Sequence, residues 1–362
     1  MIFLSTGKAP GKLYLAGEYA VVETGFPAVL TSVNKYVTVT ISRSTNGGTI
    51  QSKNLNKELI HWNRQGTELV FDDSESQLQY ILAAIKFTEK YALERGIKLD
   101  YYDLLVTSEL DSQDGKKYGL GSSAAVTVAV VKTLGDFYHL NLSAMDIYKI
   151  SAISHLSVQG NGSLGDIAAS AFGGIVAYYS PDRNWIFNMI RNHSISEILA
   201  LDWPELKIES LNLPDDLELT VGWTGSPAST SILVDRIALT KAQKVKKYQH
   251  FLQASRKNVE KLIDGFRNND SALIKQMFSK YRQLLDDLAD FSDVHIETEL
   301  LTKLCDIAEN LGGSAKTSGA GGGDCGIVLS DKNLNVAELK KEWQKVGITP
   351  LTLKIGEIIA HA

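Results

Sequence analysis

Cysteine is scarce in this chain: Cys305 and Cys325 are the only two, and they lie far apart in no metal-ligand spacing. We therefore expect no zinc site and a reducing compartment. An excess of positive charge is also missing, because 37 lysines and arginines face 42 aspartates and glutamates and leave a net charge of −5. That balance gives no support to a nucleic-acid-binding surface, although a local basic pocket for a small anion stays open.

Long apolar segments are absent as well. No run reaches the roughly 20 residues that a membrane-spanning helix needs, and residues 1–6 become polar too soon for a secretory signal peptide. No internal repeat or low-complexity tract is visible. We expect a cytoplasmic enzyme with no membrane partner and no nucleic-acid partner.

The 362 residues are enough for about two domains with substantial cores, and a hydrophobic content of 44% is ordinary for a globular protein. Residues 1–60 favour strands, because residues 36–41 alternate with period two and are β-branched. Prolines interrupt the pattern between residues 181 and 215, so we predict domains at 1–185 and 186–362. Helices are expected at residues 77–95, at about 122–139, after a Ser143 cap, and through most of 231–311.

The most informative stretch is residues 117–125, KYGLGSSAA. Gly119 and Gly121 permit tight backbone geometry, and Ser122 or Ser123 is a candidate helix N-cap. A glycine loop that enters a helix gathers free backbone N–H groups at the positive end of the helix dipole, which suits phosphate. A serine hydroxyl there can help to hold a Mg²⁺ ion carried by the phosphates. The structural alternative is a glycine turn before an ordinary buried helix.

Two other nucleotide-binding motifs fit this stretch less well. The Walker pattern G-x-x-x-x-G-K-[ST] does not occur in the chain. The dinucleotide pattern G-x-G-x-x-A is matched, but the polar residues 111–117 stand where a strand should precede it. Asp136 also falls in a segment that we predict as unbroken helix, so nicotinamide or flavin binding is disfavoured.

Further glycine-bearing segments are residues 10–19 (PGKLYLAGEY), 159–166 (QGNGSLGD) and 315–326 (AKTSGAGGGDCG). In the first, Lys12 and Glu18 can be explained as solvated edge charges. In the second, Ser163 and Asp166 fit a helix capping box, and the functional alternative for Asp166 is a buried carboxylate facing a phosphate. In the third, so many glycines before a strand favour a loop that lies against a ligand.

Residues 10–19, 119–125 and 316–324 together resemble, in that order, the three motifs of the GHMP small-molecule kinases, over the whole chain. The resemblance implies an α+β fold of two domains. The N-terminal, ATP-binding domain would be like ribosomal protein S5 domain 2 and the C-terminal domain would be ferredoxin-like, with the active site in the cleft between them.

Within this superfamily the chain most resembles the bacterial-type phosphomevalonate kinases, through residues 17–19 (GEY), 161–166 (NGSLGD) and 318–325 (SGAGGGDC). That resemblance implies γ-phosphoryl transfer from MgATP to 5-phosphomevalonate, giving ADP and 5-diphosphomevalonate in the mevalonate route to isopentenyl diphosphate. The assembly would be a monomer or a homodimer. Mevalonate kinase, the ATP-dependent diphosphomevalonate decarboxylase and a kinase-like sensor remain as alternatives.

The resemblance also implies a set of site residues. Lys12 would be catalytic through its charge, Asp166 by orienting Lys12 or assisting with a proton or metal, and Ser122 would lie near Mg²⁺. The residues implied to bind ATP are Lys117, Gly119, Leu120, Gly121, Ser122, Ser123 and Ala124. The residues implied to bind the acceptor are Lys12, Gly17, Glu18, Tyr19, Ser163, Asp166, Ser231, Ser318, Gly319 and Gly322.

Overall fold

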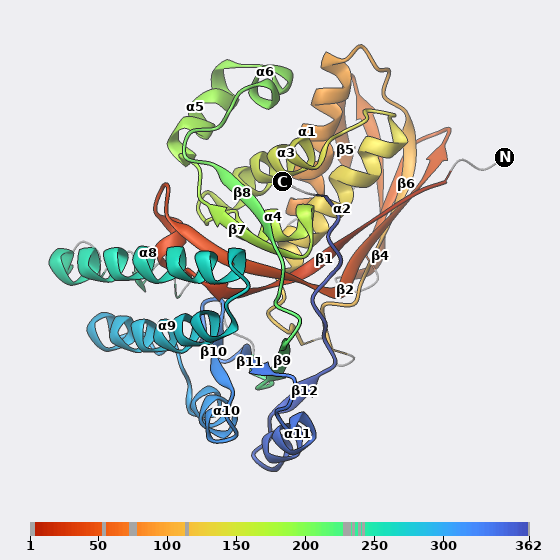
Figure 1. Cartoon of the computed structure of the whole chain (residues 1–362). Coiled ribbons are helices and arrows are strands. Elements are labelled where there is room, and N and C mark those ends of the chain that lie inside the picture. Colours follow the sequence, from red (N-terminus) through yellow and green to blue (C-terminus); the bar gives the residue numbers. More distant parts are fainter. Residues whose placement is uncertain are drawn as a thin grey trace.

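A computed structural model describes residues 4–52, 56–71, 78–112, 116–226 and 243–360, together with residues 233, 236, 237 and 240. Two β-sheets organise these residues, one of eight strands and one of four (Figure 1). The large sheet consists of β1 (Leu4–Ala16), β2 (Pro27–Ser44), β3 (Gly48–Ser52), β4 (Asn56–Gln65), β5 (Glu68–Phe71), β6 (Tyr101–Ser108), β7 (Ile175–Tyr179) and β8 (Lys207–Leu211).

The strand order of the large sheet is β5-β4-β3-β6-β2-β7-β8, and β1 pairs with β2. Strands β3 and β6 run parallel, and the other pairs are antiparallel. The alternation predicted for residues 36–41 is confirmed, because Val37, Val39 and Ile41 are buried and the residues between them are only partly buried. One face of the long strand β2 therefore carries the core.

Helices form a layer against the large sheet, where α2 packs on β1 and β2 and also contacts α1, α3 and α4. Helix α2 is buried along most of its length, as its small and β-branched residues require. Helix α3 begins at a capping box, in which the Ser143 side chain accepts from the Asp146 backbone N–H, so the predicted Ser143 cap is confirmed. The layer and its neighbours are α1 (Gln79–Glu94), α2 (Ser122–Phe137), α3 (Ala144–Gln159), α4 (Gly165–Phe172), α5 (Arg183–Asn192), α6 (Ile195–Ala200) and the 3₁₀ turn η1 (Ala20–Val22).

The small sheet is antiparallel, with the strand order β10-β11-β9-β12. Helix α8 packs beside α9 and contacts the large sheet at β2, and α9, α10 and α11 contact the small sheet (Figure 1). These elements are β9 (Leu217–Trp223), α8 (Val245–Arg267), α9 (Ser271–Ser292), α10 (Glu299–Asn310), β10 (Ser314–Ser318), β11 (Cys325–Asp331), α11 (Val336–Lys345) and β12 (Thr349–Leu351). The predicted α+β class is confirmed.

The chain crosses between the two sheets more than once. Strand β8 pairs with β7, so the large sheet includes residues 207–211, which lie beyond the predicted division at residue 185. The segment after β12 returns to the large sheet, where Ile355 bridges to Val33 and Ile358 bridges to Gly173. In the part of the chain that the structure describes, no helix is long and apolar enough to cross a membrane.

Candidate active site

A cavity of about 600 Å³ lies where the two sheets meet, within the size range of small-molecule sites. The predicted site residues that line it are Lys12, Glu18, Tyr19, Lys117, Gly119, Leu120, Gly121, Ser122, Ser123, Ser163, Asp166, Ser318 and Gly319. Gly17, Ala124 and Gly322 do not line it, and Ser231 lies outside the described residues. The three predicted motifs thus converge on one cavity although they are far apart in the sequence.

The start of α2 forms one wall of the cavity. Gly121 is the N-cap, in a left-handed conformation with φ 75°, and no side chain caps the helix. The predicted cap by Ser122 or Ser123 is therefore wrong, because both serines already lie inside the first turn. The first backbone N–H groups of α2 are left without a side-chain acceptor, and they carry the positive end of the helix dipole. This arrangement suits an anion such as phosphate.

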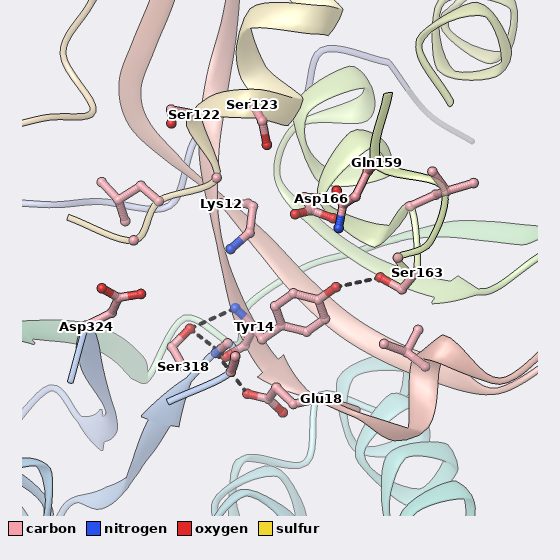
Figure 2. A pocket seen from close by; sticks show the side chains of 18 of the residues that line it. Lys12, Tyr14, Glu18, Ser122, Ser123, Gln159, Ser163, Asp166, Ser318 and Asp324 are labelled. Atoms are coloured by element: carbon pink, nitrogen blue, oxygen red, sulfur yellow. Dashed lines mark hydrogen bonds between the residues drawn. The ribbon is translucent and has the colours of Figure 1, made fainter. Parts of the chain in front are cut away.

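The glycine loop also holds Lys12 in place. The Lys12 backbone N–H donates to the Leu120 carbonyl over 2.9 Å, next to an irregularity in the pairing of β1 with β2. A Cβ atom at Gly121 would lie 2.8 Å from Lys12 Cε, so the lysine side chain passes directly over this glycine. Lys12 is only 8% exposed, and its Nζ lies 5.4 Å from the centroid of the Tyr14 ring. Figure 2 shows it reaching into the cavity between Asp166 and Asp324.

The third glycine cluster closes the opposite side of the cavity. The Ser318 hydroxyl accepts from the Tyr14 N–H over 2.9 Å and donates to the Tyr14 carbonyl over 3.1 Å, which ties β10 to β1 (Figure 2). A Cβ atom at Gly119 would lie 2.6 Å from the Asp324 carboxylate, so the glycine loop before α2 and the third glycine cluster are in close contact. The glycine loop before α2 and the C-terminal half of the chain therefore line one cavity.

Glu18 does not offer a free charge to the cavity. Its carboxylate forms an ion pair with the Lys316 ammonium, whose side chain is fully buried. Burial lowers the pKa of Lys316, and the Glu18 carboxylate opposes that shift. The Gly319 N–H also lies 3.4 Å from the Glu18 carboxylate. Glu18 therefore links residues 10–19 to residues 315–326. The sequence did not predict Lys316 as its partner.

Tyr19 and Ser163 are anchored by the protein itself. The Tyr19 hydroxyl donates to the Ala320 carbonyl over 2.5 Å. The Ser163 and Tyr14 hydroxyls are 2.9 Å apart, and the Tyr178 hydroxyl donates to the Ser163 carbonyl over 2.6 Å. The predicted capping box of Ser163 is wrong, because Leu164 is the N-cap of α4 and the Ser163 hydroxyl accepts instead from the N–H of Gly165 over 3.2 Å.

Asp166 lies in the first turn of α4, where the helix dipole favours a negative charge. Its negative charge affects the pKa values of buried groups around the cavity. Burial raises the pKa of the Tyr14 hydroxyl well above its usual value, and the Asp166 carboxylate adds to this effect. Burial lowers the pKa of the His155 imidazole, and Asp166 opposes the shift. Asp166 and Lys12 thus place opposite charges on the same cavity.

Several lining residues were not predicted, among them Tyr14, Tyr80, His155, Gln159 and Asp324. Tyr80 and His155 lie on α1 and α3, whose sequences show only the apolar periodicity of core helices. No local signal identifies them, because their place in the site depends on how α1 and α3 pack beside α2. Asp324 belonged to the third glycine cluster and could have been chosen there.

No group of three or more histidine, cysteine, aspartate or glutamate side chains in metal-binding arrangement occurs among the described residues. The oxygen donors available on the cavity wall include the Asp166 carboxylate and the hydroxyls of Ser122 and Ser123. Of the two serines, Ser123 points toward the side of the cavity that holds Asp166, and Ser122 points away from it (Figure 2). Such hard oxygen ligands, one or two in number, suit a Mg²⁺ ion that is held mainly by substrate phosphates.

Comparison with known proteins agrees with this geometry. The family model for the GHMP kinases N terminal domain matches residues 79–174, and the GHMP kinases C terminal model matches residues 262–349. A phosphomevalonate kinase of Streptomyces sp. (strain CL190) is 36% identical over 357 residues, which cover 95% of each chain.

Two solved structures are similar over almost their full length. The Lin0012 protein of Listeria innocua has a TM-score of 0.93 and 38% identity, and the match covers 98% of this chain and 99% of that one. The phosphomevalonate kinase of Streptococcus pneumoniae, solved in complex with phosphomevalonate and AMPPNP, has a TM-score of 0.85 and 30% identity, covering 97% and 99%. The motifs, the cavity that they form and these matches lead to one conclusion: the chain belongs to the GHMP kinase family.

Proposed function

We propose that this chain is an ATP-dependent phosphomevalonate kinase, which transfers the γ-phosphoryl group of MgATP to the phosphate of 5-phosphomevalonate. The products are ADP and 5-diphosphomevalonate. The observation that carries the proposal is the convergence of the open α2 N-terminus, Lys12 and Asp166 on one cavity of about 600 Å³. Its support is the 36% identity to a phosphomevalonate kinase over nearly the whole chain.

The phosphates of ATP bind at the glycine loop and at the first turn of α2. The N–H groups of that turn are not capped by a side chain, so they can donate to phosphate oxygens. Phosphoryl transfer requires little covalent chemistry from the protein, and catalysis comes from positioning and from stabilising the charge that develops. Lys117, at the edge of the same cavity, adds positive charge near this end of the site.

Lys12 offsets the negative charge that gathers between the donor and acceptor phosphates. Its side chain is nearly buried, which strengthens its interaction with an anion. Asp166 orients the Lys12 ammonium and balances its charge before the substrates arrive. No general base is needed, because a phosphate monoester has a second pKa of about 6 and is largely dianionic at neutral pH. An acceptor oxygen can then attack without losing a proton to the enzyme.

A Mg²⁺ ion carried by ATP would neutralise part of the charge on its phosphates. On this chain Asp166 and the serine hydroxyls at the start of α2 are the groups that would hold it.

The acceptor binds on the side of the cavity formed by Tyr19, Ser163, Ser318 and Gly319. The Tyr19 and Ser318 hydroxyls donate hydrogen bonds to backbone carbonyls across the contact between the first and third glycine-bearing segments. They therefore shape this part of the site as well as contacting the ligand. The Gly319 N–H and the Ser163 hydroxyl are suitable donors to the carboxylate or phosphate of an anionic acceptor.

An ADP-release assay with MgATP tests the proposal when mevalonate and 5-phosphomevalonate are offered separately. We expect turnover with 5-phosphomevalonate only, with neither CO₂ nor free phosphate released. Turnover with mevalonate alone would instead assign the chain to the sister kinase, and release of CO₂ would assign it to the decarboxylase. Absence of turnover with either compound would overturn the proposed acceptor.

Lys12→Met tests the role of the lysine. We expect kcat to fall by at least 10²-fold, because preorganised charge stabilisation of this kind contributes roughly 10²–10³-fold. Lys8→Met is the matched control, since Lys8 lies on the same strand but is exposed and does not line the cavity. Near-normal turnover of Lys12→Met would remove Lys12 from the mechanism.

A further inference from the structure

His155 lies where helices α1, α2 and α3 meet beside the cavity. It is only 5% exposed, and its ring stacks on Tyr80 of α1, with the ring centroids 4.7 Å apart. Its Nε2 lies 3.3 Å from the hydroxyl oxygen of Ser123, in the first turn of α2. Nothing in the reaction described above uses this histidine, although it lines the same cavity.

The two ring nitrogens of His155 have different surroundings. Nδ1 is buried and has no hydrogen-bond partner, whereas Nε2 has the Ser123 hydroxyl. A buried N–H without an acceptor is rare, and an unused acceptor is tolerated more often. We therefore assign the proton to Nε2 and the lone pair to Nδ1.

With this tautomer the direction of the hydrogen bond is fixed. His155 Nε2–H donates to Ser123 Oγ, so the Ser123 hydroxyl keeps its own proton for another acceptor. That hydroxyl points from the start of α2 into the cavity (Figure 2). Stacking on Tyr80 keeps the imidazole plane in the orientation that this hydrogen bond requires.

We propose that His155 is a positioning residue for nucleotide binding: its Nε2–H orients the Ser123 hydroxyl, which then donates its proton to a phosphate oxygen of ATP. The inference rests on the proposed nucleotide site at α2, but it does not depend on the identity of the acceptor. The hydrogen bond from Ser123 to the nucleotide is made to a charged group, which is the stronger class of hydrogen bond.

Four variants of the full-length chain separate this role from a structural one. His155→Phe keeps an aromatic ring to stack on Tyr80 and removes the donor. His155→Gln offers an amide N–H in place of Nε2–H. Ser123→Ala removes the oriented hydroxyl, and His155→Phe combined with Ser123→Ala completes a double-mutant cycle.

The first readout is the Kd of MgATP without any acceptor, measured by calorimetry. We expect the Kd to rise at least about tenfold in Ser123→Ala, because a hydrogen bond to a charged group is lost, and about fivefold in His155→Phe. His155→Gln should restore most of the affinity. The double variant should bind MgATP no more weakly than Ser123→Ala alone.

An unchanged Kd in His155→Phe would overturn the proposal, and so would additive losses in the double variant or a failure of His155→Gln to restore affinity. In steady-state kinetics His155→Phe should raise the KM for ATP and leave the KM for 5-phosphomevalonate unchanged. Because the binding measurement uses no acceptor, it stays decisive even if 5-phosphomevalonate proves to be the wrong substrate.

Discussion

Gly121 offers a test that links backbone geometry directly to catalysis. The residue has φ +75°, and a Cβ atom there would lie 2.8 Å from Lys12 Cε and 3.1 Å from Lys12 Cγ. Gly121→Ala therefore has two separable effects. The left-handed conformation costs an alanine roughly 1–2 kcal/mol, and the new methyl group occupies space that the Lys12 side chain uses.

The second effect can be given a magnitude. Carbon atoms in ordinary contact are about 3.5–4.0 Å apart, so the Lys12 side chain must move by about 1 Å to accept the methyl group. A misplacement of about 1 Å in a catalytic group costs on the order of 10²-fold in rate. We expect Gly121→Ala to lower kcat by about that factor while the protein stays folded.

Gly96→Ala is the matched control. Gly96 has φ +74° and no atom within 4 Å of the added Cβ, so the backbone cost is the same and no side chain is displaced. Gly96 follows α1 and does not line the cavity. Both variants should show a similar loss of unfolding free energy in urea titrations, and only Gly121→Ala should lose activity in the ADP-release assay.

Retention of full activity by Gly121→Ala would refute this reasoning, because Lys12 would then not need its observed path. An equal loss of activity in Gly96→Ala would refute it as well, since backbone strain alone would explain the result.

Two further predictions concern stability. Glu18→Gln should lower the unfolding free energy by about 3–5 kcal/mol, because it leaves the fully buried Lys316 ammonium without its counter-charge. In urea titrations, the double variant Glu18→Gln with Lys316→Met should recover part of the lost unfolding free energy. A Glu18→Gln variant as stable as the parent would contradict the expectation. Burial and the nearby Glu297 raise the pKa of Asp286 from 3.8 to about 6, so the folded state holds this proton more tightly than the unfolded state. The stability contributed by this proton is present below pH 4 and is lost as the pH rises to about 6. Asp286→Asn should therefore raise the Tm at pH 7 and leave it unchanged at pH 4. Equal Tm values of the variant and the parent at pH 7 would count against this assignment.

The sequence by itself determined the elements with a local cause. The alternation at residues 36–41 gave β2 its buried face, and Ser143 with Asp146 set the start of α3. The glycine loop at residues 119–121 gave the open start of α2, although the cap is Gly121 itself and not a serine. The three glycine-rich motifs also predicted the kinase family, since loops that must approach a phosphate closely require glycine whatever surrounds them.

Tertiary structure decided which of these residues meet and what each one does. Glu18, which we expected among the acceptor-binding residues, lines the cavity and also pairs with Lys316, 298 residues away in the sequence. Ser163 and Asp166 fit a capping box locally, yet Leu164 takes the cap position because the turn before α4 follows another path. His155 gives no local signal, because its place in the cavity arises from packing between α3 and the start of α2. The pairing of buried charges and the contacts between helices depend on positions in space. Those positions are set by how the two sheets and their helices pack together, and not by the local sequence.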